Sequence, residues 1–283
     1  MCKDCGCDKK QKGCCEKFEA ILTRLQEVPL NNSKAYGRVK AVLVCNKLTL
    51  SGYFEELESR YDTELGSSIQ LGHAGQTGAV ELALTASLDC NELNGYFSDC
   101  DNVFELTDDQ VSALKNRQLY INVVSEDLAA GELRGQLLPE SYRYFIANLT
   151  GDNVVPDAVV TTARGTLLFE LDSFDLTVSG YFDQLSDVLL PDADGVVAHI
   201  HYGPALTNGP VIFPLHVVAD LDELGGTVLS GRNVYPLNCE QLKLLKEKDY
   251  YITVHTAANP AGEIRSQICK LKYVKPCTRE LQY

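Results

Sequence analysis

Residues 120–137, YINVVSEDLAAGELRGQL, decide the fold, because a closely similar stretch returns at residues 251–268 as YITVHTAANPAGEIRSQI. A second stretch, FEAILTRLQEVPL from Phe18, returns in the same way as FIANLTGDNVVPD from Phe145. The spacing is 127 residues for the second pair (18 to 145) and 131 residues for the first (120 to 251). Self-similarity at a nearly constant spacing indicates a repeated structural unit, so we expect two tandem copies of one domain.

The two copies divide the 283-residue chain into four parts. LTLSGYFEEL from Leu48 matches LTVSGYFDQL from Leu176, which places the same strand-like segment in each copy. Small insertions between strands explain the drift in spacing. We predict a Cys-rich N-terminal arm at 1–16, a degenerate first domain at 17–139, a second domain at 143–271 and a C-terminal tail at 272–283.

The pattern within each copy is that of β-strands. Short runs such as GRVKAVLV and GTLLFELD are rich in Val, Leu, Phe and Thr, and Gly, Asn, Asp and Pro separate them. One short helix per copy is expected, because Thr107 and Gln110 in the first copy and Asn238 and Gln241 in the second have the spacing of a capping box. We therefore predict an all-β fold of two tandem antiparallel β-sandwiches, each with one short helix.

The composition is that of an acidic globular protein. Hydrophobic residues make up 45% of the chain, the net charge is -14 and the pI is ≈ 4.8. Nucleic-acid-binding proteins carry a basic patch, so this charge argues against a nucleic-acid partner. No apolar run is long enough to span a membrane, and the first residues lack the charged-then-apolar pattern of a secretory signal peptide.

Three motifs of the second copy point to a known family. They are ANLTGDNVVPD at 147–157, AHIHYG at 198–203 and HTAANPAGEIRSQI at 255–268. In this order and spacing they resemble the CHRD domain, the module named after chordin, and the first copy fits in outline through EVP and GELRGQL. The resemblance implies Ig-like β-sandwiches similar to copper–zinc superoxide dismutase. It implies a fold more firmly than an activity, since the activity of the family is mostly undefined.

Three histidines of the second copy form a candidate metal site. His199 and His201 are two residues apart, so on a strand both side chains point to the same face, about 7 Å apart. His255 joins them if the last strands neighbour the His-x-His strand. Imidazole ligands suit copper or zinc, and the resemblance to superoxide dismutase implies copper, with Arg265 placed to steer an anionic substrate.

A purely structural interpretation of these residues competes with the metal site. The His-x-His pair then forms hydrogen bonds within the sandwich, while a buried ion pair fixes the last hairpin, Glu263 with Arg265 in the second copy and Glu132 with Arg134 in the first. The positions of His199, His201 and His255 correspond to Ser68, Gln70 and Val124 in the first copy. The three-His set is therefore either a site of the second copy alone or a relic.

Eleven cysteines, an odd number, require at least one that is free, metal-bound or joined to another chain. Five lie at the N-terminus: Cys2, Cys5, Cys7, Cys14 and Cys15. This segment is a small metal knuckle, a disordered tail, or, as we favour, an extension that docks on a neighbouring subunit through intersubunit disulfides. Inside the chain, Cys90 with Cys100 and Cys269 with Cys277 are candidates for local disulfides.

No catalytic motif was found: the chain has no phosphate-binding Gly-rich loop, no nucleophile elbow and no zinc-protease helix. We therefore predict a non-enzymatic structural protein that self-assembles with copies of itself into a disulfide-crosslinked fibre or layer. We expect it outside the cell or on a cell or spore surface. The alternatives are a copper- or zinc-binding protein that uses the three histidines, and an extracellular ligand-binding module.

Overall fold

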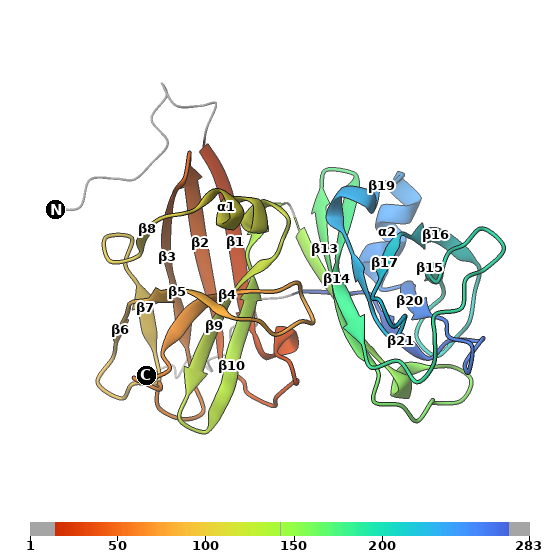
Figure 1. Cartoon of the computed structure of the whole chain (residues 1–283), viewed down its shortest axis with the longest axis horizontal. Helices are drawn as coiled ribbons and strands as arrows, with labels where there is room; N and C mark the ends of the chain where they lie inside the picture. The colour runs from red at the N-terminus through yellow and green to blue at the C-terminus, as the bar shows by residue number, and fades with distance from the viewer. Residues whose placement is uncertain (1–14, 142, 272–283) are drawn as a thin grey trace, which may run out of the picture.

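The computed structural model describes residues 15–141 and 143–271. It contains two domains that lie side by side along the long axis of the molecule (Figure 1), and both are built almost entirely of antiparallel strands. The all-β, two-domain fold predicted from the sequence is confirmed.

The first domain is one antiparallel sheet that folds over on itself. Its strands are β1 (Cys15–Thr23), β2 (Tyr36–Val44), β3 (Lys47–Glu55), β4 (Ser67–Leu71), β5 (Val80–Leu84), β6 (Ala86–Leu88), β7 (Gly95–Phe97), β8 (Val103–Glu105), β9 (Leu119–Ser125), β10 (Leu128–Gln136) and β11 (Leu138–Pro139). They pair in the order β5-β4-β9-β10-β1-β2-β3-β7-β6, with β11 on β1 and β8 on β3. The β1–β10 register is the single pair Thr23↔Arg134, and the two layers of the sandwich meet at this narrow junction.

The second domain repeats this topology strand for strand. Its strands are β12 (Arg143–Thr150), β13 (Arg164–Asp172), β14 (Asp175–Asp183), β15 (Ala198–Tyr202), β16 (Val211–Leu215), β17 (Val217–Ala219), β18 (Gly226–Val228), β19 (Val234–Pro236), β20 (Tyr250–Val254), β21 (Ile264–Gln267) and β22 (Cys269–Lys270). The order is β16-β15-β20-β21-β12-β13-β14-β18-β17, with β19 on β14 and β22 on β12. The internal repeat seen in the sequence is therefore a repeat of structure.

Each domain carries the single short α-helix that was expected. Helix α1 (Asp108–Lys115) begins after Thr107, and α2 (Cys239–Glu247) begins after Asn238. Both predicted capping boxes are present, because the N-cap side chain and the Gln three residues later bond each other's backbone N–H groups. Three short 3₁₀ turns complete the described secondary structure: η1 (Arg24–Gln26), η2 (Gly151–Asn153) and η3 (Ser230–Arg232).

Alternation along the paired strands β15 and β20 separates the core from the polar outer face of the second domain. The inward-facing side chains are fully buried in the hydrophobic core; they are Ala198, Ile200, Ile252 and Val254. Successive strand residues point to opposite faces, so His199 and His201 on β15 lie on the outer face with Tyr251 and Thr253 of β20.

The two domains contact each other through an apolar cluster and an ion pair. The cluster contains Ala74, Leu138, Tyr144, Ile146, Leu168 and Leu271. Beside it, the guanidinium of Arg117 donates two hydrogen bonds to the carboxylate of Glu170, at 2.9 and 3.2 Å. This pair joins α1's C-terminal turn to β13, and Glu170 is only 5% exposed. Within the described residues, neither helix has the length and apolar character needed to cross a membrane.

Candidate metal site

Strand pairing brings the three predicted ligands together. On the paired strands β15 and β20, His199 lies opposite Thr253 and His201 opposite Tyr251. His255 follows β20 directly, and its backbone N–H donates to the carbonyl of Val197, the residue before β15. The condition set from the sequence, that the last strands neighbour the His-x-His strand, is therefore met.

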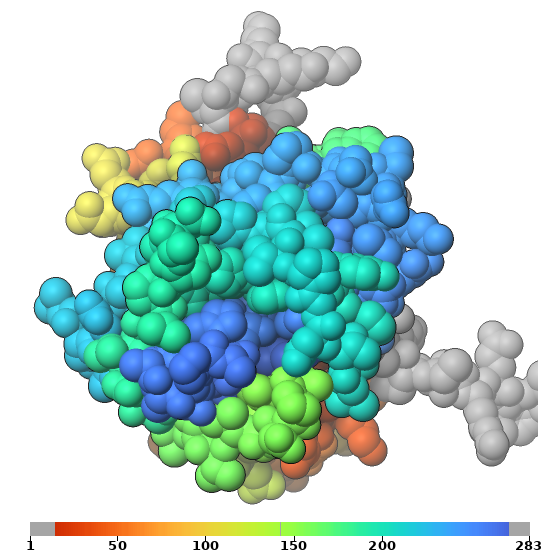
Figure 2. All heavy atoms as spheres, turned by 90° about the vertical axis from the view of Figure 1, so that its right-hand side faces the viewer, coloured from red at the N-terminus to blue at the C-terminus, as the bar shows by residue number. Residues whose placement is uncertain are grey.

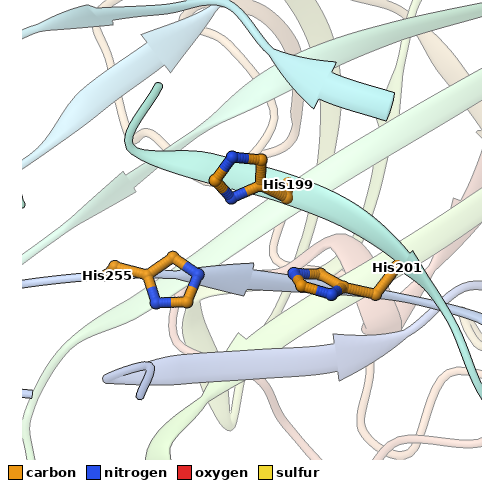
Figure 3. A group of neighbouring side chains, drawn as sticks. All are labelled: His199, His201 and His255. Carbon is orange, nitrogen blue, oxygen red and sulfur yellow. The ribbon is translucent and has the colours of Figure 1, made fainter. Parts of the chain in front are cut away.

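The three imidazoles converge on one point. One ring nitrogen of each histidine can be chosen so that all three lie within 4.8 Å of one another. The ring centroids are 5.6 Å apart for His199 and His255, 5.8 Å for His199 and His201, and 6.4 Å for His201 and His255. Figure 3 shows two rings projecting from β15 and the third from the end of β20 toward the same space. A metal ion with bonds of about 2.0–2.1 Å to nitrogen would draw the three rings closer together.

The second nitrogen of each ring is already bonded. His199 donates from Nε2 to Oδ2 of Asp192 at 2.9 Å, while His201 and His255 donate from Nδ1 to the carbonyls of Gly209 and Pro260, each at 3.0 Å. Metal-ligating histidines characteristically make such a bond, which fixes the tautomer and the ring orientation. The nitrogens left for a ligand are therefore Nδ1 of His199 and Nε2 of His201 and His255.

Two of these nitrogens are buried without a hydrogen-bond partner. They are Nδ1 of His199 and Nε2 of His201. A buried polar atom without a partner costs about 1–3 kcal/mol, so a native structure that keeps two of them side by side needs an explanation. A metal ion shared by the two rings would supply the missing partner for both.

Burial lowers the pKa values of His201 and His255 and so favours their neutral imidazoles, the form that binds a metal. Burial, together with the charges of His199, His255 and Arg265, lowers the pKa of His201 to about 4. Burial and His199 also lower the pKa of His255. Both lone pairs are thus available at neutral pH.

Arg265 does not occupy the position of an anion-steering residue, so that expectation is wrong. Its guanidinium donates to Oδ1 of Asn208 at 2.7 Å and to the carbonyl of Thr207 at 2.6 Å, and it lies 3.6 Å from the ring centroid of Tyr251. Tyr251 in turn stacks on His201. Arg265 is 3% exposed, and its role here is to hold the 203–210 loop against the strand.

The expected Glu–Arg ion pairs are also replaced by separate hydrogen-bond sets. Glu263 accepts hydrogen bonds from Thr161, Ser186 and Thr256, at 2.7 to 2.8 Å. Among the described residues, no ion pair joins it to Arg265.

In the first domain, Glu132 accepts from the Ser33 hydroxyl and the Glu58 backbone N–H. Arg134 donates to the carbonyls of His73 and Gln76. The loops that cover the outer face supply partners to each charged group, so the carboxylate and the guanidinium are held apart in both domains.

The corresponding face of the first domain lacks ligands. Ser68 and Gln70 of β4 lie opposite Asn122 and Tyr120 of β9, and Gln70 bonds Ser68 at 3.0 Å and the Tyr120 hydroxyl at 2.6 Å. The Gln70 amide therefore has hydrogen-bond partners on this face, whereas Nδ1 of His199 and Nε2 of His201 have none in the second domain. Elsewhere in the described residues, His73 is buried beside Gln118 at 3.3 Å and His216 is exposed.

Both predicted local disulfides are wrong. Cys90, Cys239 and Cys269 carry free thiols. Cys90 lies in the turn before β7 and Cys100 in the turn after it, so β7 holds them at opposite ends. Cys15 and Cys100 each take part in a disulfide bond, so Cys100 is not available to Cys90, whose thiol is free. The remaining N-terminal cysteines (Cys2, Cys5, Cys7 and Cys14) and Cys277 lie outside the described residues, so the intersubunit disulfides stay a prediction.

The sequence did not point to the residues that orient the histidines. Asp192 lies seven positions before His199, in a turn where its Oδ1 accepts the backbone N–H groups of Asp194 and Val196. Gly209 and Pro260 act through backbone carbonyls, which leave no side-chain signal. Only the Asp-Ala-Asp-Gly turn before the His-x-His strand could have been noticed.

Comparison with known protein families identifies both domains. The family model described as CHRD domain matches the chain twice, at residues 18–137 and 145–268. No curated protein matches the chain.

Proposed function

The chain belongs to the CHRD-domain family, and we propose that its second domain binds one copper or zinc ion through His199, His201 and His255. One observation carries the proposal: a ring nitrogen from each of the three histidines can be chosen so that all three lie within 4.8 Å of one another, and one nitrogen of each ring is held by a fixed acceptor. A structural hydrogen-bonded pair would not need a third histidine or leave two buried nitrogens without partners.

The donor set suits copper or zinc. Three neutral imidazoles are typical ligands of both, and divalent copper generally binds such sites more tightly. Three protein ligands leave a fourth coordination position for water or another small molecule. On this proposal the protein holds a metal ion and is not an enzyme.

The test is metal stoichiometry in the full chain, measured after loading with Cu²⁺ or Zn²⁺ and desalting. We expect one ion per chain. His201→Gln removes one of the three ligands and should reduce binding at least tenfold. The variant should still fold, because Gln70 occupies the matching position of the first domain. His216→Gln is the matched control, since the side chain of His216 is exposed. A metal content of zero in the loaded protein, or equal binding by all three proteins, would rule the proposal out.

A second candidate function is disulfide-linked self-assembly. The exposed thiols of Cys90 and Cys239 favour it, since they are accessible for exchange with another chain. The N-terminal cysteines would add further links. On this candidate the protein is a structural subunit of a fibre or layer outside the cell or on a cell or spore surface, and CHRD domains occur in extracellular proteins.

Negative-stain electron microscopy with and without reductant tests this candidate. Fibres or sheets that loosen on reduction would support it. A protein that stays monomeric under oxidising conditions, with no ladder on a non-reducing gel, would exclude it. The third candidate, an extracellular ligand-binding module, has no contact surface that the described residues single out.

A further inference from the structure

Four loops surround the three-His site, at the end of the second domain that is remote from the first. They are 151–163, 184–197, 203–210 and 255–262. Hydrogen bonds from the histidines reach three of them, and the fourth is tied in by the bond from the Asn208 side chain to the carbonyl of Val155 at 3.0 Å. In Figure 2 this end faces the viewer, and the blue segment that contains His255 is framed by green and cyan loops.

The charges on these loops are all of one sign. The loops contain five aspartates and neither lysine nor arginine; the aspartates are Asp152, Asp157, Asp187, Asp192 and Asp194. We name these five residues the acidic rim. Four of them are exposed and Asp187 is half-buried. The matching loops of the first domain mix signs, for example Arg24, Lys34 and Arg60 with Glu27 and Glu58.

The one buried cation near the site does not offset the rim. Arg265 is 3% exposed, and its guanidinium is occupied by Asn208, Thr207 and the Tyr251 ring. The charges that these four loops present to solvent are therefore those of the aspartates. A cleft lined by charges of one sign concentrates ions of the opposite sign and can raise association rates by about 10–10³.

We propose that the acidic rim makes the three-His site a trap for cations: it draws in free, hydrated divalent metal ions and keeps anionic molecules from the open coordination position. This inference rests on the proposed metal binding and names what the site takes up. The acidic rim also distinguishes this site from metal sites that act on small anions. Such sites need exposed lysine or arginine side chains to attract the anion, and the four loops carry aspartates instead.

Stopped-flow association of Cu²⁺ with the full chain tests the inference. The fluorescence of tyrosine is the readout, since the chain has no Trp and Tyr251 stacks on His201. The rim variant is Asp187→Asn with Asp194→Asn, which removes two charges and no metal contact. The matched control is Asp172→Asn with Asp175→Asn, which removes two exposed charges on the β13–β14 turn.

We expect the rim variant to bind Cu²⁺ about fivefold more slowly than the unmodified protein at about 10 mM ionic strength, and at the same rate at about 1 M, because fixed unit charges attract a dication until salt screens them. The control should match the unmodified protein. Equal rates for all three proteins, with metal binding intact, would overturn this inference alone. If the unmodified protein takes up no Cu²⁺ at equilibrium, the proposed function fails as well.

Discussion

The buried carboxyl of Glu27 should make the free energy of unfolding depend on pH, and its surroundings set the sign and size of the effect. It follows η1, is 4% exposed, and its Oε1 has no hydrogen-bond partner. Burial raises its pKa from 4.5 to about 8, although Arg134 acts in the opposite direction. Glu27 should therefore be protonated in the folded protein at neutral pH. The matching residue of the second domain is the apolar Val154.

The raised pKa sets the direction of the pH dependence. Below about pH 4.5 the folded and unfolded chains both carry the proton. Between about pH 4.5 and 8 the unfolded chain loses it and the folded chain keeps it, so the free energy of unfolding falls. Since one pKa unit is worth about 1.4 kcal/mol, the upper limit is ~5 kcal/mol. We expect about 2 kcal/mol, because water entry and local relaxation reduce the cost of a buried charge.

Glu27→Gln tests this reasoning, because the amide has the shape of the protonated acid and cannot ionise. We expect the Tm of the variant to exceed that of the unmodified protein by about 4–8 °C at pH 9 and by little at pH 5, in thermal unfolding followed by circular dichroism. Glu64→Gln, an exposed residue of the same domain, should change neither value. A variant less stable than the unmodified protein at every pH would refute the argument, since it would mean that an ionised Glu27 pairs with Arg134.

Three further changes test the packing. Gly75→Ala places a Cβ 2.7 Å from the carbonyl of Tyr181 at a φ of +90°, so it should cost about 1–3 kcal/mol and loosen the domain contact, as judged by faster proteolysis between the domains. Arg117→Met leaves the buried Glu170 without its partner and should cost about 3 kcal/mol in chemical denaturation, and adding Glu170→Leu should restore much of the loss. Asn238→Ala removes the N-cap of α2 and should cost about 1 kcal/mol in the same assay.

The fold was predictable because its signals are local or repeated. Capping boxes act within four residues, so Thr107 and Asn238 mark their helices without knowledge of the rest of the chain. Strand alternation placed His199 and His201 on one face, and the repeat showed that the two copies share one topology. His255 could be added only on the condition that its strand neighbours theirs, which is a matter of tertiary pairing.

The wrong predictions concern which side chains lie next to one another in space, and this depends on tertiary structure. Cys90 and Cys100 are close in the chain, yet a strand separates their turns. Glu263 and Arg265 are two residues apart, yet loops that are distant in sequence supply their partners, through Thr161 and Asn208. Asp192 was missed for the same reason, because only the folded loop brings its carboxylate to an imidazole.

The most direct test of the central claim is a crystal structure of the Cu²⁺- or Zn²⁺-loaded protein, with anomalous diffraction recorded at the absorption edge of the metal. The proposed metal site predicts one anomalous peak per chain, about 2.0–2.1 Å from Nδ1 of His199 and from Nε2 of His201 and His255. A loaded protein with no peak between these nitrogens, or with its metal bound only elsewhere, would contradict it.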